Sequence, residues 1–227
     1  MRELPGMPPG RGHAGIGRVW IAATQDSGTG VDRTVVDRRI EGAPGQMRPT
    51  IVKPTGQERR FSTDEFIVSK TDLKGIIRYA NDVFLRVSAA DEADLIGKPH
   101  NVIRHPDMPR AVYKLLWDGI QARREVFAYV LNLAFDGAHY WIFAHVTPSF
   151  GPEGAVVAYH SNRRSPDQHA LSRVQPLYAK LRAEERRHAN ASDALAASTD
   201  LFESMLAGLG QTYDEFVWTL SPEDGRS

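Results

Sequence analysis

Two cations, an acid and three prolines lie close together in the segment from Gly97 to Pro109, whose sequence is GKPHNVIRHPDMP. The segment falls between two predicted helices, which suits the wall of a ligand pocket better than a core element. A guanidinium binds oxyanions through two parallel hydrogen bonds and an imidazole can add a donor, so Arg104 and His105 are candidates for binding a phosphate or another polar ligand edge. The alternative is a charged cap without a ligand, and Asp107 is suited to cap the helix that begins at Pro109.

The elements that must position this segment follow from the residue pattern. Short β-branched runs at residues 65–69 and 75–79, separated by the turn sequence TDLKG, predict a hairpin. Short helices are predicted from Asn81 to residue 87 and over residues 90–96, and Gly97 ends the second. A longer helix follows Pro109, which fits the first turn because proline lacks only an amide hydrogen that is unpaired there.

Two long strands are predicted at residues 125–135 and 139–149, joined by Asp136-Gly137, a strong hairpin signal. A last strand covers residues 155–162. Two strands, several helices and three antiparallel strands pack most simply as an antiparallel sheet with helices on one face. We therefore expect an α+β fold with a five-stranded antiparallel sheet.

Alternation along the strand after Gly137 divides its side chains between two faces. One face is small and apolar, as the wall against a planar ring should be, and carries Tyr140, Ile142, Ala144 and Val146. The other face is expected to meet solvent, a flanking helix or a dimer partner, and carries His139, Trp141, Phe143 and His145.

The two ends of the chain differ in character. Residues 1–50 are rich in glycine and proline with little apolar periodicity, so we expect them to be disordered, with Met47 as an alternative translation start. Residues 166–221 are expected to form a helical extension. Its first helix has an apolar stripe at spacings of three and four, from Leu171 to Leu181, and helices over residues 191–206 and 212–220 would cover that stripe within one chain or between two copies.

Several of these residues carry a resemblance to a known family. Asn81 followed by a short helix, a glycine and a polar loop resembles a PAS sensor domain, and the run from Arg104 to Pro109 resembles the flavin-binding PAS domain of bacterial aerotaxis receptors. The resemblance spans residues 61–165, under half of the chain. It implies a PAS fold that binds a flavin non-covalently, with FAD as the first expectation and FMN or an empty pocket as alternatives.

The resemblance also implies roles for individual residues. Arg104 and His105 would help to hold FAD, and Asn132, nine residues before Trp141, would contact the flavin, whose mixed edge suits an amide. The alternative for Asn132 is that it satisfies backbone groups near the hairpin end, and Asn81 has two equal interpretations, as a helix cap and as a flavin contact. The predicted cofactor-binding residues are Asn81, Arg104, His105, Asp107, Tyr113, Trp117, Asn132 and His160.

Three of these assignments are looser. Trp117 matches a tryptophan of the aerotaxis receptors, but its apolar helix stripe makes ordinary core packing equally plausible, and Tyr113 lies one turn earlier on the same surface. His160 aligns with a flavin-facing position of related light-sensing domains and would tune flavin protonation. The chain departs from the receptor pattern near Val126 and Phe127, where a tryptophan is expected, and at residues 133–135, where an arginine-rich turn is replaced.

Composition excludes several classes of function. The chain has no cysteine, which removes disulfides, thiolate metal sites and the cysteinyl-flavin adduct of light-oxygen-voltage domains. Lys plus Arg equals Asp plus Glu at 28 each, so no whole-protein field would concentrate nucleic acid. No stretch approaches the roughly 18 to 20 apolar residues of a membrane span, and a cytoplasmic location is expected.

These observations favour a non-enzymatic cytoplasmic sensor of redox state or oxygen that forms a homodimer and relays its state through the C-terminal helices to an unknown partner protein. The runner-up is a PAS interaction or dimerisation module without a cofactor. Haem sensing would need a pocket-facing histidine from His100, His105 or His160, and histidine in a polar loop is a poor axial ligand. A flavin enzyme would need an acid and base or nucleophile constellation, and the sequence offers none.

Overall fold

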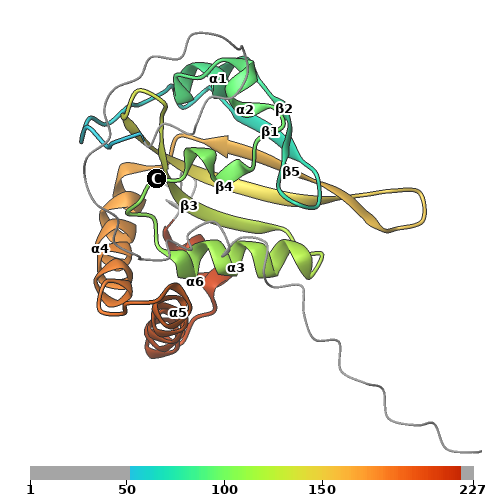
Figure 1. Cartoon of the computed structure of the whole chain (residues 1–227). Helices are drawn as coiled ribbons and strands as arrows, with labels where there is room; N and C mark the ends of the chain where they lie inside the picture. Colours follow the sequence, from blue (N-terminus) through green and yellow to red (C-terminus); the bar gives the residue numbers. More distant parts are fainter. Residues whose placement is uncertain (1–51, 221–227) are drawn as a thin grey trace, which may run out of the picture. The chain divides into compact units, whose positions relative to one another are not determined.

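A single antiparallel sheet organises the molecule (Figure 1). The computed structural model describes residues 52–220, so the expectations for residues 1–50 and Met47 lie outside the described residues. The strand order is β2-β1-β5-β4-β3, and each predicted strand is present. The strands are β1 (Ile67–Thr71), β2 (Ile77–Ala80), β3 (Val126–Leu133), β4 (His139–Phe150) and β5 (Val156–Arg164).

The helices fall into two groups along the chain. The first group separates β2 from β3 and contains α1 (Asp82–Ser88), α2 (Glu92–Leu95), the 3₁₀ helix η1 (His100–Ile103) and α3 (Arg110–Gln121). The second follows β5 and contains α4 (Gln168–Glu185), α5 (Ala191–Gly208) and α6 (Tyr213–Leu220). The sequence did not predict η1, and Pro109 precedes α3 as its N-cap instead of lying inside its first turn. The expected α+β fold with a five-stranded antiparallel sheet and a C-terminal helical extension is confirmed.

Asn81 joins α1 to the sheet. Its side-chain oxygen accepts hydrogen bonds from the backbone N–H groups of Phe84, at 3.1 Å, and Val68, at 2.9 Å. Its amide nitrogen donates to the carbonyl of Phe66 at 2.8 Å. The asparagine therefore caps the helix and fixes its entry angle against β1, as a cap residue should.

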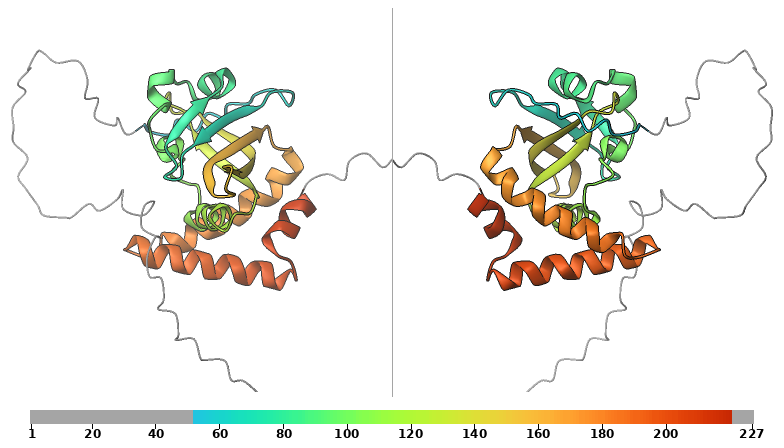
Figure 2. Two further views of the ribbon diagram at one scale, coloured as in Figure 1. Left: turned by 90° about the vertical axis from the view of Figure 1, so that its right-hand side faces the viewer. Right: turned by 90° about the vertical axis from the view of Figure 1, so that its left-hand side faces the viewer.

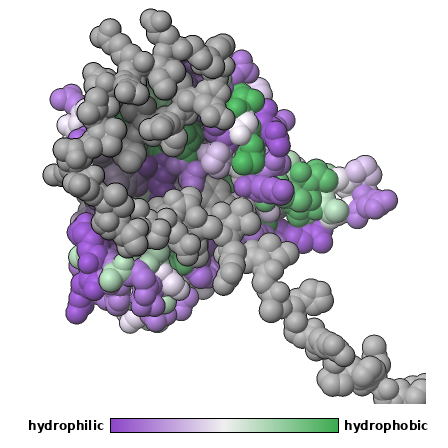
Figure 3. All heavy atoms as spheres, viewed as in Figure 1, coloured by the Kyte–Doolittle hydropathy of each residue, from purple (hydrophilic) through white to green (hydrophobic). Residues whose placement is uncertain are grey.

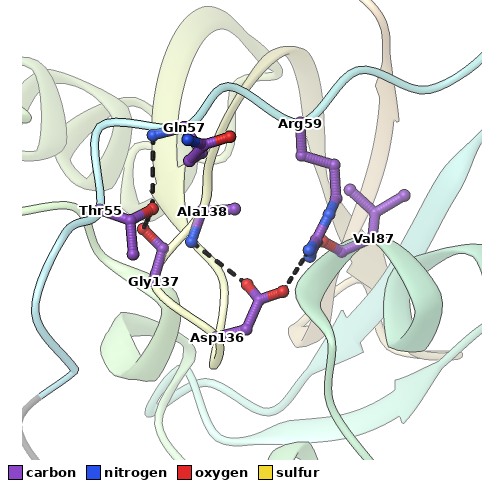
Figure 4. Close-up of polar contacts among 7 residues, drawn as sticks. All are labelled: Thr55, Gln57, Arg59, Val87, Asp136, Gly137 and Ala138. Carbon is purple, nitrogen blue, oxygen red and sulfur yellow. Dashed lines mark hydrogen bonds and ion pairs between the residues drawn. The ribbon is translucent and has the colours of Figure 1, made fainter.

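The segment of residues 55–59 closes over the turn between β3 and β4 (Figure 4). The N–H of Thr55 donates to the carbonyl of Gly137 at 2.9 Å, and Arg59 forms an ion pair with Asp136 while donating to the carbonyl of Val87 at 2.9 Å. Gly137 has φ +87°, and a Cβ there would lie 2.5 Å from the carbonyl oxygen of Lys53. Both the backbone conformation and the close approach therefore require glycine.

The sheet has two distinct faces. On the inner face, Tyr140 reaches Ser88 of α1 with an oxygen separation of 2.8 Å. On the outer face, Trp141 packs against Tyr178 of α4, and Phe127 packs against Trp218 of α6. Alternation therefore divides β4 as expected, and a flanking helix meets part of its outer face.

The C-terminal helices form a separate layer (Figure 2). In both views α5 lies beyond α4, on the side away from the sheet, and α6 returns toward the sheet. The phenol of Tyr178 donates a buried hydrogen bond of 2.7 Å to the carbonyl of Tyr129 on β3. This bond anchors α4 to the edge strand, so the extension is built onto the sheet.

The β4–β5 hairpin protrudes from the rest of the molecule (Figure 1) and carries an apolar surface near its tip (Figure 3). Phe150 and Val157 there are 51% and 54% exposed. Arg123 lies over the Phe150 ring at 5.1 Å and donates to the carbonyl of Gly154, so the hairpin is braced from the end of α3.

Candidate functional site

Among the described residues, several polar side chains are buried on the inner face of the sheet. The side chains at the centre of this face are small, because Ala128 of β3 pairs directly with Ala144 of β4 and both are buried. The same face also carries the buried polar residues Ser69, Asn132, Tyr140 and Arg163. An apolar surface with a few polar groups is the usual composition of a ligand site.

Asn132 is 2% exposed, and its side-chain nitrogen interacts with the Tyr140 phenol without making a hydrogen bond of full geometry. Its backbone forms an isolated bridge with Arg104, and its neighbour across the β3–β4 ladder is Tyr140. Burial raises the pKa of Tyr140 to about 12, so that phenol stays protonated. A buried amide whose donors are not all filled is costly and indicates a ligand or a water at this point.

Arg163 was not among the residues predicted from the sequence, although it is 1% exposed and lies near the end of β5. One of its terminal nitrogens donates to the hydroxyl of Ser69, while its Nε and its other terminal nitrogen have no partner. Its guanidinium lies over the Phe84 ring at 4.4 Å. The available signal was strand alternation, which places Tyr159, Ser161 and Arg163 on one face.

His100 of η1 borders the same region. Its ring stacks on Phe84 with centroids 5.9 Å apart, and its Nε2 lies 3.4 Å from the Ser69 hydroxyl. Desolvation, and then the positive charge of Arg163, lower the pKa of His100 to about 3. The imidazole is therefore neutral at physiological pH.

The loop from Arg104 to Pro109 runs from η1 to α3. The guanidinium of Arg104 stacks on the Tyr113 ring at 4.3 Å and donates to the Met108 carbonyl at 3.3 Å. Burial raises the pKa of Tyr113 to about 12. Arg104 is thus held by an aromatic ring and one carbonyl, which leaves most of its five donors for another acceptor.

His105 is 6% exposed and has a local structural role. Its Nδ1 accepts a hydrogen bond of 3.0 Å from the N–H of Asp107, and its ring lies 6.0 Å from that of His139. Desolvation is the largest of the effects that lower the pKa of His105. The neutral ring therefore shapes the turn between Arg104 and Met108.

Asp107 does not cap α3. Its side chain is 64% exposed, and Glu185 at the end of α4 supplies the cap by accepting a hydrogen bond of 2.5 Å from the N–H of Arg110. Glu185 is 4% exposed and also forms an ion pair with Arg182. A carboxylate at a helix N-terminus is favourable, and here it joins two elements that are distant in sequence.

The remaining predicted residues make other contacts. The side-chain oxygen and nitrogen of Asn81 both serve the backbone contacts described above. Trp117 of α3 packs against Tyr159 in an edge-on arrangement, with the two ring centroids 5.7 Å apart. In β5, His160 points to the outer face, opposite Arg163, so in this geometry it does not face the interior expected for it.

The outer face contains a concave region of about 650 Å³. Phe127, Phe143 and Trp218 contribute aromatic surface to it. It lies on the opposite side of the sheet from Asn132, so the two regions are separate.

Residues 52–220 contain no group of three or more His, Cys, Asp or Glu side chains placed to hold a metal ion. None of the helices in the same range combines the length and the apolar character needed to span a bilayer.

Comparisons with known proteins agree with this geometry. A protein-family model described as "PAS fold" matches residues 62–160. The aerotaxis receptor of Escherichia coli (strain K12) is 36% identical over 129 residues, which cover 57% of this chain and 25% of the receptor. The nitrogen fixation regulatory protein of Klebsiella pneumoniae is 28% identical over 129 residues, with the same coverage of each chain. The match thus spans about a quarter of the length of these relatives.

A solved structure described as the light state of the blue-light photoreceptor Aureochrome1 LOV is 19% identical and covers 54% of this chain and 91% of its own, with a TM-score of 0.43. The sequence-based resemblance to PAS domains and to aerotaxis receptors is therefore confirmed by the family model and the receptor match.

Proposed function

Because residues 62–160 form a PAS domain, we propose that this protein is a sensor that binds a flavin non-covalently between the inner face of its sheet and the helices α1, η1 and α3. FAD is the flavin of the proposal, since the run from Arg104 to Pro109 is the segment that resembles aerotaxis receptors. The signal is the redox state of the cell or oxygen. The protein acts in the cytoplasm as a homodimer, catalyses no reaction and passes its state to a partner protein.

The observation that carries the proposal is the set of buried donors without acceptors. Arg163 leaves two guanidinium nitrogens unpaired, and the amide nitrogen of Asn132 makes no hydrogen bond of full geometry beyond its interaction with the Tyr140 phenol, all on the inner face. Native proteins rarely leave such groups unsatisfied, because each costs about 1–3 kcal/mol. The pyrimidine edge of a flavin carries carbonyl and ring-nitrogen acceptors, so the residues present fit the group.

Each residue has a role in this arrangement. Asn132 and Arg163 would donate to the polar edge of the ring, and Ala128 and Ala144 would present their small side chains to its plane. Arg104 would bind the phosphate end, since its guanidinium has donors left beyond its contact with Met108. When bound, the flavin supplies reversible electron transfer, and the surrounding residues orient it and exclude water.

Two contacts support a relay through the C-terminal helices. Glu185 of α4 caps α3 one residue beyond the loop that ends at Pro109, and Tyr178 of α4 bonds to the backbone of β3. A change of charge on the ring would alter the contacts of Asn132 and Arg104, which bridge each other through their backbones. Movement of β3 or of the loop is then transmitted to α4 without an additional element.

An absorption spectrum of the purified full-length protein tests the proposal. Two bands in the near-ultraviolet and blue, with FAD released on heat denaturation, are the expected result. Asn132→Ala is expected to weaken flavin binding at least tenfold, whereas Asn162→Ala on the outer face of β5 should leave it unchanged. Protein that is colourless and fails to take up added FAD or FMN would contradict the proposal.

The outer concave region favours a second candidate function. Trp218 there is 55% exposed beside Phe127 and Phe143, and exposed aromatic surface is typical of interaction sites. A PAS interaction module without a cofactor would use this surface. It predicts colourless protein that tolerates both Asn132→Ala and Arg104→Ala.

A further inference from the structure

Arg163 is a fully buried arginine, and no carboxylate of residues 52–220 forms an ion pair with it. It lies on β5 between Ile67 of β1 and Ala144 of β4, and its exposed fraction is 1%. Arginine is almost never buried to this degree unless it is paired with an acid. Its neighbour Arg164 is exposed and lies on the other face of the strand, which provides a matched comparison within the chain.

The groups that face Arg163 from each surrounding element carry no negative charge. β1 contributes the Ser69 hydroxyl, α1 contributes the Phe84 ring, and β4 contributes Tyr140. His100 of η1 is neutral at physiological pH, and His160 lies behind the sheet. The cation is thus compensated only by one hydroxyl and by aromatic rings.

The charge nevertheless persists at neutral pH. Burial lowers the pKa of Arg163 to about 10, and Tyr140, whose own pKa is raised to about 12, remains an uncharged phenol. Taking an isolated cation out of water costs several kcal/mol. Without a ligand, the protein therefore carries an uncompensated positive charge in its interior.

The position of the Arg163 charge relative to Asn132 indicates that a ligand compensates this charge. Tyr140 is the ladder neighbour of Asn132 and also interacts electrostatically with Arg163. Tyr140 thus interacts with both residues, and Asn132 and Arg163 each keep a side-chain nitrogen without a hydrogen bond of full geometry. A ligand that reaches both residues would place its acceptors against Asn132 and its most negative atoms against Arg163.

We propose that Arg163 receives the pyrimidine edge of the bound flavin and stabilises the anionic reduced form, and so sets the redox potential at which the sensor switches. The inference rests on the proposed function and adds to it the residue that determines the potential. Reduction by two electrons from a reductant such as dithionite, with uptake of one proton at the central ring, leaves one negative charge spread over N1 and the C2 carbonyl. Arg163 binds this charge more strongly than it binds the neutral oxidised edge.

The test compares full-length wild-type protein with Arg163→Met, Arg163→Lys and the control Arg164→Met. The midpoint potential of the bound flavin is measured by equilibrium reduction against a reference dye. Arg163→Met is expected to reduce the preference for reduced over oxidised flavin at least tenfold, which for a two-electron couple is about 30 mV toward negative potential. Arg163→Lys keeps the charge and should fall between wild type and Arg163→Met, and Arg164→Met should match wild type.

A second readout needs no flavin. Because the cation is uncompensated in flavin-free protein, Arg163→Met should raise the melting temperature of that form, whereas added flavin should stabilise wild type more than the variant. Unchanged potential in flavin-loaded Arg163→Met, or a lower melting temperature of its flavin-free form, overturns the inference. Wild-type protein that binds no flavin contradicts the proposed function instead, so the two failures are distinguishable.

Discussion

The carboxylate of Glu185 accepts a hydrogen bond of 2.5 Å from the backbone N–H of Arg110, although the two residues are 75 positions apart in the chain. Arg110 is the first residue of α3, directly after the loop that contains Arg104 and His105. Glu185 is the last residue of α4. The start of α3 and the end of the first C-terminal helix are therefore held together by one buried carboxylate.

Replacing Glu185 with alanine should destabilise the protein by about 2–3 kcal/mol, since a charge-assisted hydrogen bond is lost and Arg182 is left without its partner. Chemical denaturation measures this loss. Glu184→Ala is the control, because that neighbouring carboxylate pairs with Arg187 and His188 near the surface and should cost below about 1 kcal/mol. Equal losses in the two variants would show that Glu185 has no special structural role.

The hydrogen bond between Glu185 and Arg110 predicts a route by which the redox state of the flavin reaches the C-terminal helices. In wild-type protein loaded with flavin, reduction should change hydrogen–deuterium exchange in both α3 and α4. In Glu185→Gln, which loses the charge but keeps the size of the side chain, the change in α3 should persist while that in α4 becomes smaller. Identical exchange of α4 in oxidised and reduced wild-type protein would argue against a relay through this helix.

Much of this architecture could be predicted from local sequence. The glycine of Asp136-Gly137 marks the hairpin turn, and alternation in β4 correctly separates Tyr140 from Trp141. The face of β5 is harder to predict, because a one-residue shift in register exchanges the two faces, and the β4–β5 pairing contains an irregularity at Ser149 and Phe150. Arg163 is therefore not predicted from the sequence, whereas His160 is predicted to lie on the inner face.

Contacts between distant segments could not be predicted in this way. Asp107 has the residue type and the position of a local helix cap, yet the carboxylate that performs this role comes from Glu185. The incompletely satisfied amide of Asn132 likewise depends on burial by elements far from it in sequence. Local spacing identifies the residue types that could bind a ligand, and only packing determines which of them remain unpaired.

The contact between residues 53–55 and the β3–β4 turn can be tested with two glycines. Gly137 and Gly154 both have positive φ, of +87° and +74°, so alanine costs about 1–2 kcal/mol of backbone strain at either position. Only Gly137→Ala also forces a Cβ against the Lys53 carbonyl, while nothing lies within 4 Å at Gly154. Gly137→Ala should therefore lose more stability than Gly154→Ala, and more rapid proteolysis near residue 55 should accompany the loss. Equal stability losses would mean that the segment is not held against the turn.

Acid sensitivity should originate at His100. Its folded-state pKa of about 3 lies below its ordinary value, so between these values the unfolded chain binds a proton that the folded protein does not. Stability must therefore fall as the pH falls below about 6.5, by at most about 1.4 kcal/mol per pH unit from this residue. The lowered pKa values of His105 and His160 act in the same direction.

Urea unfolding at several pH values between about 6.5 and 5 avoids most carboxylate titration and should give a shallower pH dependence for His100→Gln than for wild type. A matched change at the exposed His169 should leave the slope unaltered, and an unaltered slope in His100→Gln would assign the acid sensitivity to other groups.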